Sequence, residues 1–104
     1  KVVTTQTGKL LFISRSPIPI GKNKNFKKAM KQVCIYSFPS EQLHMFGRMK
    51  NKTPLEEIED IEILRFLEMG FNVQMIKMSS HSIPVDNPED IKLVEERLNI
   101  ELSV

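Results

Sequence analysis

The sequence is poor in the residues that build several kinds of functional site. It contains one cysteine and no tryptophan among its 104 residues. An internal disulfide is therefore excluded, and a reducing cytoplasm is the expected compartment. No apolar run approaches the roughly 20 residues that a membrane-spanning helix needs. No signal-peptide pattern opens the chain, and no glycine-rich phosphate-binding loop is present. The net charge of +2 is too small to indicate a nucleic-acid or membrane partner by itself.

Histidine is also scarce, and its two positions do not suggest catalysis. His44 and His81 are far apart, and neither has a cysteine or carboxylate at the spacing of a zinc site. Ser14, Ser37 and Ser40 have no partner histidine at a recognisable spacing, so nucleophilic catalysis has no support. We expect both histidines to lie at the surface.

The longest helical pattern runs from Thr53 to Gly70 and predicts one uninterrupted helix. Thr53 and Glu56 form a capping box with proline at the first helical position. Gly70 suits the left-handed residue that ends many helices. Apolar residues recur at helical spacing and predict a broad face packed on the core, formed by Leu55, Ile58, Ile61, Ile63, Leu64, Phe66 and Leu67. We expect the other segments to pack around this helix.

Three parts of the chain predict strands. Residues 1–5 and 9–14 are β-rich runs on either side of a short turn that ends in Gly8, which predicts a hairpin. Residues 32–38, QVCIYSF, form an apolar run typical of a central strand covered on both faces, so the single cysteine is expected to be buried. Residues 72–78 alternate in polarity directly after the long helix. Strands that alternate with helices indicate an α/β fold.

Two further helices and a long loop complete the expected organisation. Ser40 is a plausible cap for a short helix. Asn87 and Pro88 predict the start of a last helix, whose apolar stripe is Ile91, Val94 and Leu98. Residues 15–31 lack a clear period and predict an exposed loop with a helical turn near residues 26–30.

The same loop leaves open a different class of function. It is basic, with lysines at Lys22, Lys24, Lys27, Lys28 and Lys31. Such a run can serve a stand-alone interaction module that binds nucleic acid, but an ordinary solvated loop explains it too and is the commoner case. Phe26 is the one aromatic residue within the run, which argues against a platform for stacked bases.

Two charged residues lie where an element ends and have both a functional and an ordinary interpretation. Asp86 precedes the last helix without being its cap, so its carboxylate could point into a crevice, but acidic residues are common before helices. Arg15 follows a predicted strand and could present its guanidinium to a carboxylate or phosphate. A surface ion pair is an equal explanation for Arg15.

Read together, four motifs resemble the C-terminal part of the CMP-KDO synthetases, the cytidylyltransferases that activate 3-deoxy-manno-octulosonate (KDO) for lipopolysaccharide assembly. In order, they are LFISRSPIP at 11–19, IY at 35–36, the helix TPLEEIEDIEILRFLEMG at 53–70 and VDNPED at 85–90. They look like the family's strand with its SRxxIP turn, its GIY strand, its SPLExIExLEQLRxLxxG helix and its VDTPED motif. Four motifs in the right order over nearly the whole chain make a specific signal.

The resemblance implies a nucleotidyl transfer in which a hydroxyl of the sugar acid attacks the α-phosphate of CTP and pyrophosphate leaves, with Mg²⁺ as cofactor. It implies that Arg15, Gln32, Tyr36 and Glu62 bind substrate and that Asp86 binds the metal. It also implies a homodimer in the cytoplasm, with neither membrane nor nucleic acid as partner.

The implied fold is a three-layer α/β/α nucleotide-diphospho-sugar transferase-like domain. Residues 1–104 would form the C-terminal half of its mixed sheet with the flanking helices, the portion for sugar-acid binding and dimerisation. The family's N-terminal nucleotide-binding half has no counterpart in this sequence, and the first residue is lysine. We therefore expect a chain whose beginning has been removed or lies elsewhere, and which does not catalyse alone.

Three positions depart from the family pattern. Gln32 stands where the family usually has histidine, Cys34 where it has glycine, and Ile63 where it has the glutamine after the pocket glutamate. A polar contact is expected to be lost at Ile63. These departures leave open an altered sugar specificity or a lost activity.

Overall fold

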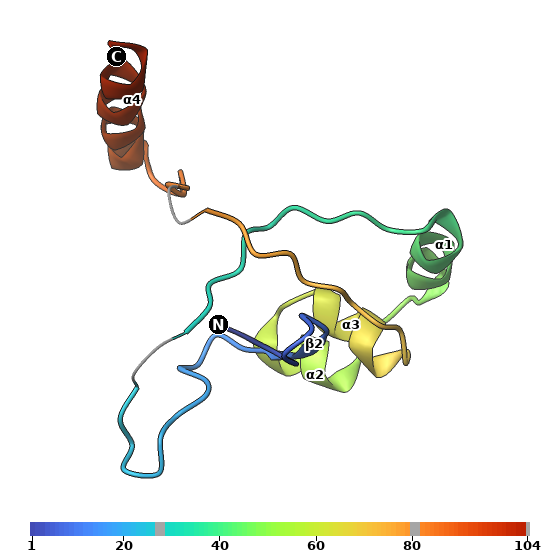
Figure 1. Ribbon diagram of the computed structural model, residues 1–104. Coiled ribbons are helices and arrows are strands. Elements are labelled where there is room, and N and C mark those ends of the chain that lie inside the picture. The colour runs from blue at the N-terminus through green and yellow to red at the C-terminus, as the bar shows by residue number, and fades with distance from the viewer. Residues whose placement is uncertain (27–28, 80–81, 104) are drawn as a thin grey trace.

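The computed structural model describes residues 1–26, 29–79 and 82–103. Within these ranges the chain is a small α/β structure of two strands and four helices. The strands are β1 (Val2–Thr4) and β2 (Leu10–Ile13), and the helices are α1 (Ser40–Arg48), α2 (Pro54–Glu59), α3 (Ile63–Glu68) and α4 (Pro88–Leu102). Figure 1 shows the hairpin beside α2 and α3, whereas α1 and α4 lie at the far ends of extended segments.

The predicted hairpin is confirmed. β1 pairs with β2 in antiparallel register, with Val2 opposite Ile13. Gly8 has a φ of +89°, which favours glycine. A Cβ at this position would also lie 2.6 Å from the side-chain nitrogen of Gln74 and 2.9 Å from the carbonyl oxygen of Met75. The turn therefore needs glycine for its backbone angle and for the close approach of a distant segment.

That distant segment is the predicted strand at residues 72–78. The Leu10 amide donates to the Val73 carbonyl at 2.8 Å, and the Met75 amide donates to the Gly8 carbonyl at 2.8 Å. The pairing amounts to an isolated bridge, so the prediction of a strand is wrong. The predicted alternation is nevertheless present, since Val73 and Met75 are half-buried and the residues between and after them are exposed.

The predicted continuous helix is broken at Asp60. This residue adopts a left-handed conformation with φ +52° and ψ +48°, and it separates α2 from α3. Arg15 donates to the backbone carbonyl of Glu59 at 2.6 Å, using an acceptor that a continuous helix would need for its own amides. A contact with a residue far away in the sequence thus accompanies the break. The predicted capping box at the start of α2 is confirmed.

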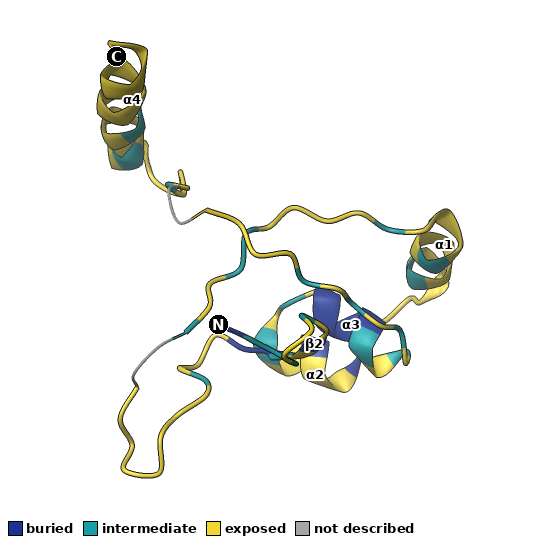
Figure 2. Ribbon diagram, in the orientation of Figure 1, coloured by how far each residue is buried: buried dark blue, intermediate teal, exposed yellow. Residues whose placement is uncertain are grey.

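The hydrophobic core is small and lies between the hairpin and α3. Figure 2 shows the buried positions concentrated there, and they include Val2, Leu10, Ile13, Ile63, Leu64 and Phe66. The prediction that Ile58 and Leu55 face the core is wrong, because their exposed fractions are 78% and 38%. The left-handed residue between the helices rotates α3 relative to α2, so the two helices do not share one apolar face.

The predicted central strand at residues 32–38 is also wrong. The segment has no regular secondary structure, and Ile35 is 79% exposed. Cys34 is exposed rather than buried. A buried strand needs neighbours to accept and donate its backbone hydrogen bonds, and in the described part of the chain neither β1 nor β2 pairs with this segment.

The two outer helices are only partly as predicted. α4 starts with the expected capping box of Asn87 and Asp90, yet none of its residues is buried. Its predicted stripe is therefore largely open to solvent. Ser40 is the first helical residue of α1 rather than its cap, a position held by Pro39. Among the described residues, no helix is both long enough and apolar enough to cross a membrane.

The remaining predictions concern the basic loop and the histidines. Residues 15–26 contain no helix or strand and are mostly exposed, as expected. The predicted helical turn near residues 26–30 falls partly outside the described residues, as do Lys27, Lys28 and His81. His44 is exposed on α1, as predicted.

Candidate functional site

Arg15 is held by the end of α2. Its Nε donates to the Glu59 carbonyl at 2.6 Å, and its Nη2 donates to the Asp60 carbonyl at 3.1 Å. The guanidinium also lies 3.8 Å from the Asp60 carboxylate, yet the side chain remains 67% exposed. A guanidinium has five N–H donors. Arg15 is thus fixed along one edge while other donors stay open to an anion.

The turn that carries Arg15 is wrapped around the carboxylate of Glu59. The Ser14 hydroxyl donates to one carboxylate oxygen at 2.5 Å, and the Arg15 amide donates to the other at 3.0 Å. The Ser16 amide donates in turn to the Ser14 hydroxyl oxygen at 3.0 Å. The hydrogen bond from Ser14, followed by that from the Arg15 amide, holds the pKa of Glu59 below its ordinary value. Glu59 is therefore a carboxylate at neutral pH.

Tyr36 is placed by a series of aromatic contacts. Its ring centroid lies 5.8 Å from that of Phe38. Phe38 stacks on the buried Phe66 of α3 at 4.7 Å, and Phe46 of α1 stacks on the same Phe66 at 4.9 Å. These rings attach the exposed segment 32–38 to α3. The segment is therefore held to the core by the packing of Phe38 and not by the strand pairing that was expected.

Glu62 acts electrostatically on Tyr36. Partial burial raises the pKa of Tyr36 to about 12, and the neighbouring Cys34 and Glu62 shift this pKa in the same direction. The hydroxyl is therefore protonated at neutral pH and can donate a hydrogen bond. Glu62 is exposed at the start of α3, directly after the helix break. Two of the predicted site residues thus interact electrostatically.

A buried ion pair that no local pattern predicts fixes α3 against α2. Arg65 donates to the Glu56 carboxylate through Nε at 2.5 Å and through Nη2 at 2.7 Å. The Arg65 guanidinium also lies 3.9 Å from the ring centroid of Phe46. The hydrogen bonds between the two side chains lower the pKa of Glu56 and raise the pKa of Arg65. The two residues are nine positions apart, which is not the spacing of an ion pair within one helix.

No described contact joins Gln32 or Asp86 to Arg15, Tyr36 or Glu62. Gln32 is half-buried. Asp86 is exposed, and its amide donates to the Asp90 carboxylate at 3.0 Å, which supports the start of α4. Ile63, where a polar contact was expected to be lost, is 4% exposed in the core. Its isoleucine side chain therefore contributes to packing.

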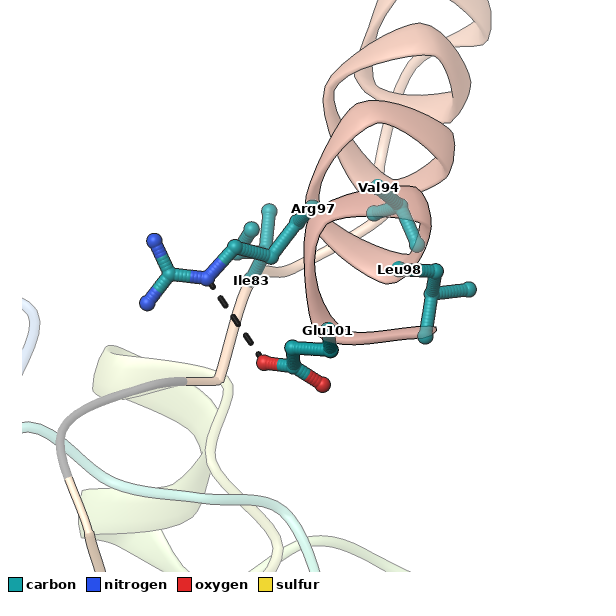
Figure 3. Close-up of a pocket in the computed structure, with 5 residues that line it drawn as sticks. All are labelled: Ile83, Val94, Arg97, Leu98 and Glu101. Atoms are coloured by element: carbon teal, nitrogen blue, oxygen red, sulfur yellow. Dashed lines mark ion pairs between the residues drawn. The ribbon is translucent and has the colours of Figure 1, made fainter. Parts of the chain in front are cut away.

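A shallow pocket lies elsewhere, against the later turns of α4 (Figure 3). It is lined by Ile83, Val94, Arg97, Leu98 and Glu101. The Nε of Arg97 lies 3.7 Å from the Glu101 carboxylate, and both side chains are largely exposed. None of the predicted site residues lines this pocket.

The fit of a magnesium ion depends on oxygen ligands. Within residues 1–26, 29–79 and 82–103, no three histidine, cysteine, aspartate or glutamate side chains cluster to hold a metal. Asp86 is an accessible carboxylate, the kind of hard ligand that magnesium prefers. Magnesium usually combines one or two carboxylates with water and substrate phosphates. The described residues can therefore supply one such ligand but not a complete site.

Comparison with known proteins finds no matching family model, but it does find curated relatives. The chain is 39% identical to the 3-deoxy-manno-octulosonate cytidylyltransferase of Geobacter metallireducens, over 95% of the chain and 43% of that protein. It is 37% identical to the enzyme of the same name from Chlorobium luteolum, over 94% of the chain and 39% of that protein. It is 33% identical to the 8-amino-3,8-dideoxy-manno-octulosonate cytidylyltransferase of Shewanella pealeana, over 97% of the chain and 41% of that protein. The chain spans about two fifths of the length of these relatives.

Proposed function

We propose that this chain, which is related over nearly all of its length to the 3-deoxy-manno-octulosonate cytidylyltransferase family, is part of an enzyme that transfers CMP from CTP to a KDO-like sugar acid. The observation that carries the proposal is this similarity, together with the four sequence motifs that match the family in order. Pyrophosphate would be the second product. The chain itself would provide the sugar-acid side of the site.

The geometry around Arg15 and Tyr36 supports this assignment. The partly open guanidinium of Arg15 suits the carboxylate of a sugar acid, because its planar donors match a carboxylate in pairs. The protonated hydroxyl of Tyr36 and the exposed carboxylate of Glu62 offer a donor and an acceptor for sugar hydroxyls. We assign Gln32 to the same pocket, since it lies on the segment that carries Tyr36.

The reaction we propose is attack of a sugar-acid hydroxyl on the α-phosphate of CTP. Negative charge on the phosphates has to be offset in the transition state, and a bound Mg²⁺ would supply the compensating positive charge. Asp86 would be one of the oxygen ligands of this ion. Its other ligands would be substrate phosphates, water and protein groups outside the described residues.

We further propose that the whole protein is a three-layer α/β/α homodimer in the cytoplasm. Two features support additional packing partners. The apolar segment 32–38 is largely exposed, and α4 buries none of its residues. Both would be covered by the protein region that corresponds to the rest of the relatives, or by a second copy. Exposed apolar surface of this extent is typical of an interface.

Pyrophosphate release in the presence of CTP and KDO tests the proposal. The chain alone should show no release above background. A longer natural product that contains it, or a chimera in which it replaces the matching region of the Geobacter metallireducens relative, should release pyrophosphate only when both substrates are present. A folded chimera without activity would contradict the proposal. Salt-dependent binding of random oligonucleotides by the chain would favour the nucleic-acid interpretation of residues 22–31.

A further inference from the structure

The break between α2 and α3 changes which donors reach two backbone carbonyls. In a continuous helix, the Asp60 carbonyl would accept from the amide of Leu64, four residues later. Here the Leu64 amide donates to Ile61 at 3.1 Å, because Asp60 is left-handed. The carbonyls of Glu59 and Asp60 accept from Arg15 instead. The irregular residue thus creates a paired acceptor for one guanidinium edge.

Glu59 accepts hydrogen bonds from the Ser14–Arg15 segment at three of its oxygens. One carboxylate oxygen accepts from the Ser14 hydroxyl and the other from the Arg15 amide. The backbone carbonyl accepts from the Arg15 side chain. Ser14 is 3% exposed, so its hydroxyl is held in place by the surrounding structure. The Glu59 carboxylate therefore fixes the Arg15 backbone, and the backbone carbonyl of the same residue orients the Arg15 side chain.

The positive charge of Arg15 is only partly neutralised by these contacts. The nearest carboxylate is that of Asp60, at 3.8 Å, and the Lys52 ammonium lies 2.5 Å from the same carboxylate. The carbonyls of Glu59 and Asp60 carry no net charge. The exposed edge of the guanidinium is thus a cationic group in a fixed direction. Fixing such a side chain before a ligand arrives removes part of the ordering cost of binding.

We propose that Glu59 is a positioning residue that acts through Arg15 and presents the free edge of its guanidinium to an anionic group of the substrate. The identity of that group as a sugar-acid carboxylate rests on the proposed function. The positioning role of Glu59 itself rests on the hydrogen bonds that it accepts from Ser14 and Arg15. Ser14 takes part in this positioning, since its hydroxyl donates to one of the Glu59 carboxylate oxygens.

A spectroscopic test on the chain itself does not depend on any activity. Solvent exchange of the Arg15 backbone amide, which donates to the Glu59 carboxylate, should be slow in the wild type when followed by ¹⁵N NMR. Glu59→Gln should accelerate this exchange about tenfold, because the amide then donates to a neutral side-chain oxygen in place of a charged one. Glu57→Gln is the matched control, since Glu57 lies exposed on the same helix, and it should leave the exchange rate unchanged. Ser14→Ala, nearly isosteric, replaces Glu59→Gln if that variant fails to fold. An unaltered exchange rate in the folded Glu59→Gln variant, or in Ser14→Ala where that replaces it, would overturn the proposal.

A kinetic test addresses the substrate, using the active longer protein or the chimera. Glu59→Gln should raise KM for KDO about tenfold, leave KM for CTP unchanged, and have no further effect when Arg15→Ala is already present. Additive effects of the two substitutions, or an equal rise in both KM values, would overturn the positioning role. If the longer protein or chimera without any substitution releases no pyrophosphate, the proposed function is refuted. The role of Glu59 is still decided by the exchange measurement on the chain.

Discussion

Replacing Glu56 with alanine is expected to leave a buried guanidinium without its carboxylate. Glu56 is 1% exposed and Arg65 9% exposed, and two hydrogen bonds join them at 2.5 and 2.7 Å. The other described acceptor for Arg65 is the Phe46 carbonyl, at 3.5 Å. One long hydrogen bond cannot replace the pair. Glu56 also accepts from the Thr53 amide at 3.2 Å, so the start of α2 loses a cap.

The size of the effect follows from these contacts. Removing one partner of a buried ion pair costs about 3–5 kcal/mol, and a lost helix cap costs about 0.5–2 kcal/mol. We therefore expect Glu56→Ala to lower the free energy of unfolding by about 4 kcal/mol or more. The total for a small domain is only about 5–15 kcal/mol. The double variant Glu56→Leu, Arg65→Met removes both charges and should recover much of the loss.

Urea denaturation followed by far-UV circular dichroism measures this change, since the chain has no tryptophan for fluorescence. Glu57→Ala is the control on the same helix. As an exposed substitution, it should stay within about 0.5 kcal/mol of the wild type. A folded Glu56→Ala variant within about 1 kcal/mol of the wild type would refute the reasoning, because it would show that the guanidinium is solvated.

Four other outcomes are expected. Because the folded-state pKa values of Glu56 and Glu59 lie below the ordinary 4.5, thermal stability should be constant above about pH 5.5 and should fall as pH drops below about 4.5; a melting midpoint independent of pH down to 3 would contradict this. Leu64→Ala should cost about 2–5 kcal/mol in urea denaturation, whereas Ile58→Ala, at a site that is 78% exposed, should be nearly neutral; equal costs would mean that α2 is oriented differently. Sedimentation should show self-association at high concentration, driven by the exposed face of α4, and a well-behaved monomer would argue against it. In an active chimera with the Geobacter metallireducens relative, Asp86→Asn should lower turnover about a hundredfold with the fold intact, and near-normal turnover would reduce Asp86 to a helix-start residue.

Features that depend on neighbouring residues could be predicted from the sequence. The turn at Gly8, the capping box of α2 and the start of α4 at Asn87 are all present. A cap or tight turn is decided by groups within four positions of each other, so its chemistry is visible in the sequence. The resemblance to the cytidylyltransferase family, based on motifs of the same local kind, is likewise confirmed by the curated relatives.

Features that depend on distant partners could not be predicted. The break at Asp60 accompanies hydrogen bonds from Arg15, which lies 45 positions earlier in the chain. The apolar pattern of residues 32–38 indicates a buried strand, but burial requires neighbouring strands that the described chain does not place there. At the site, the structure joins Tyr36 with Glu62 electrostatically, whereas the substrate and metal roles of the predicted residues stay predictions.

The separation of the core along the chain has a consequence for synthesis. The hairpin is complete at Ile13, but its packing partners on α3 begin at Ile63, fifty residues later. Translation proceeds at about 5–20 residues per second, so the nascent hairpin spends roughly 3–10 s without α3. An isolated hairpin is marginal in water, and its unpaired edges can recruit other nascent chains. Before α3 leaves the ribosome, the hairpin therefore lacks its packing partners and its edges are open to pairing with other chains.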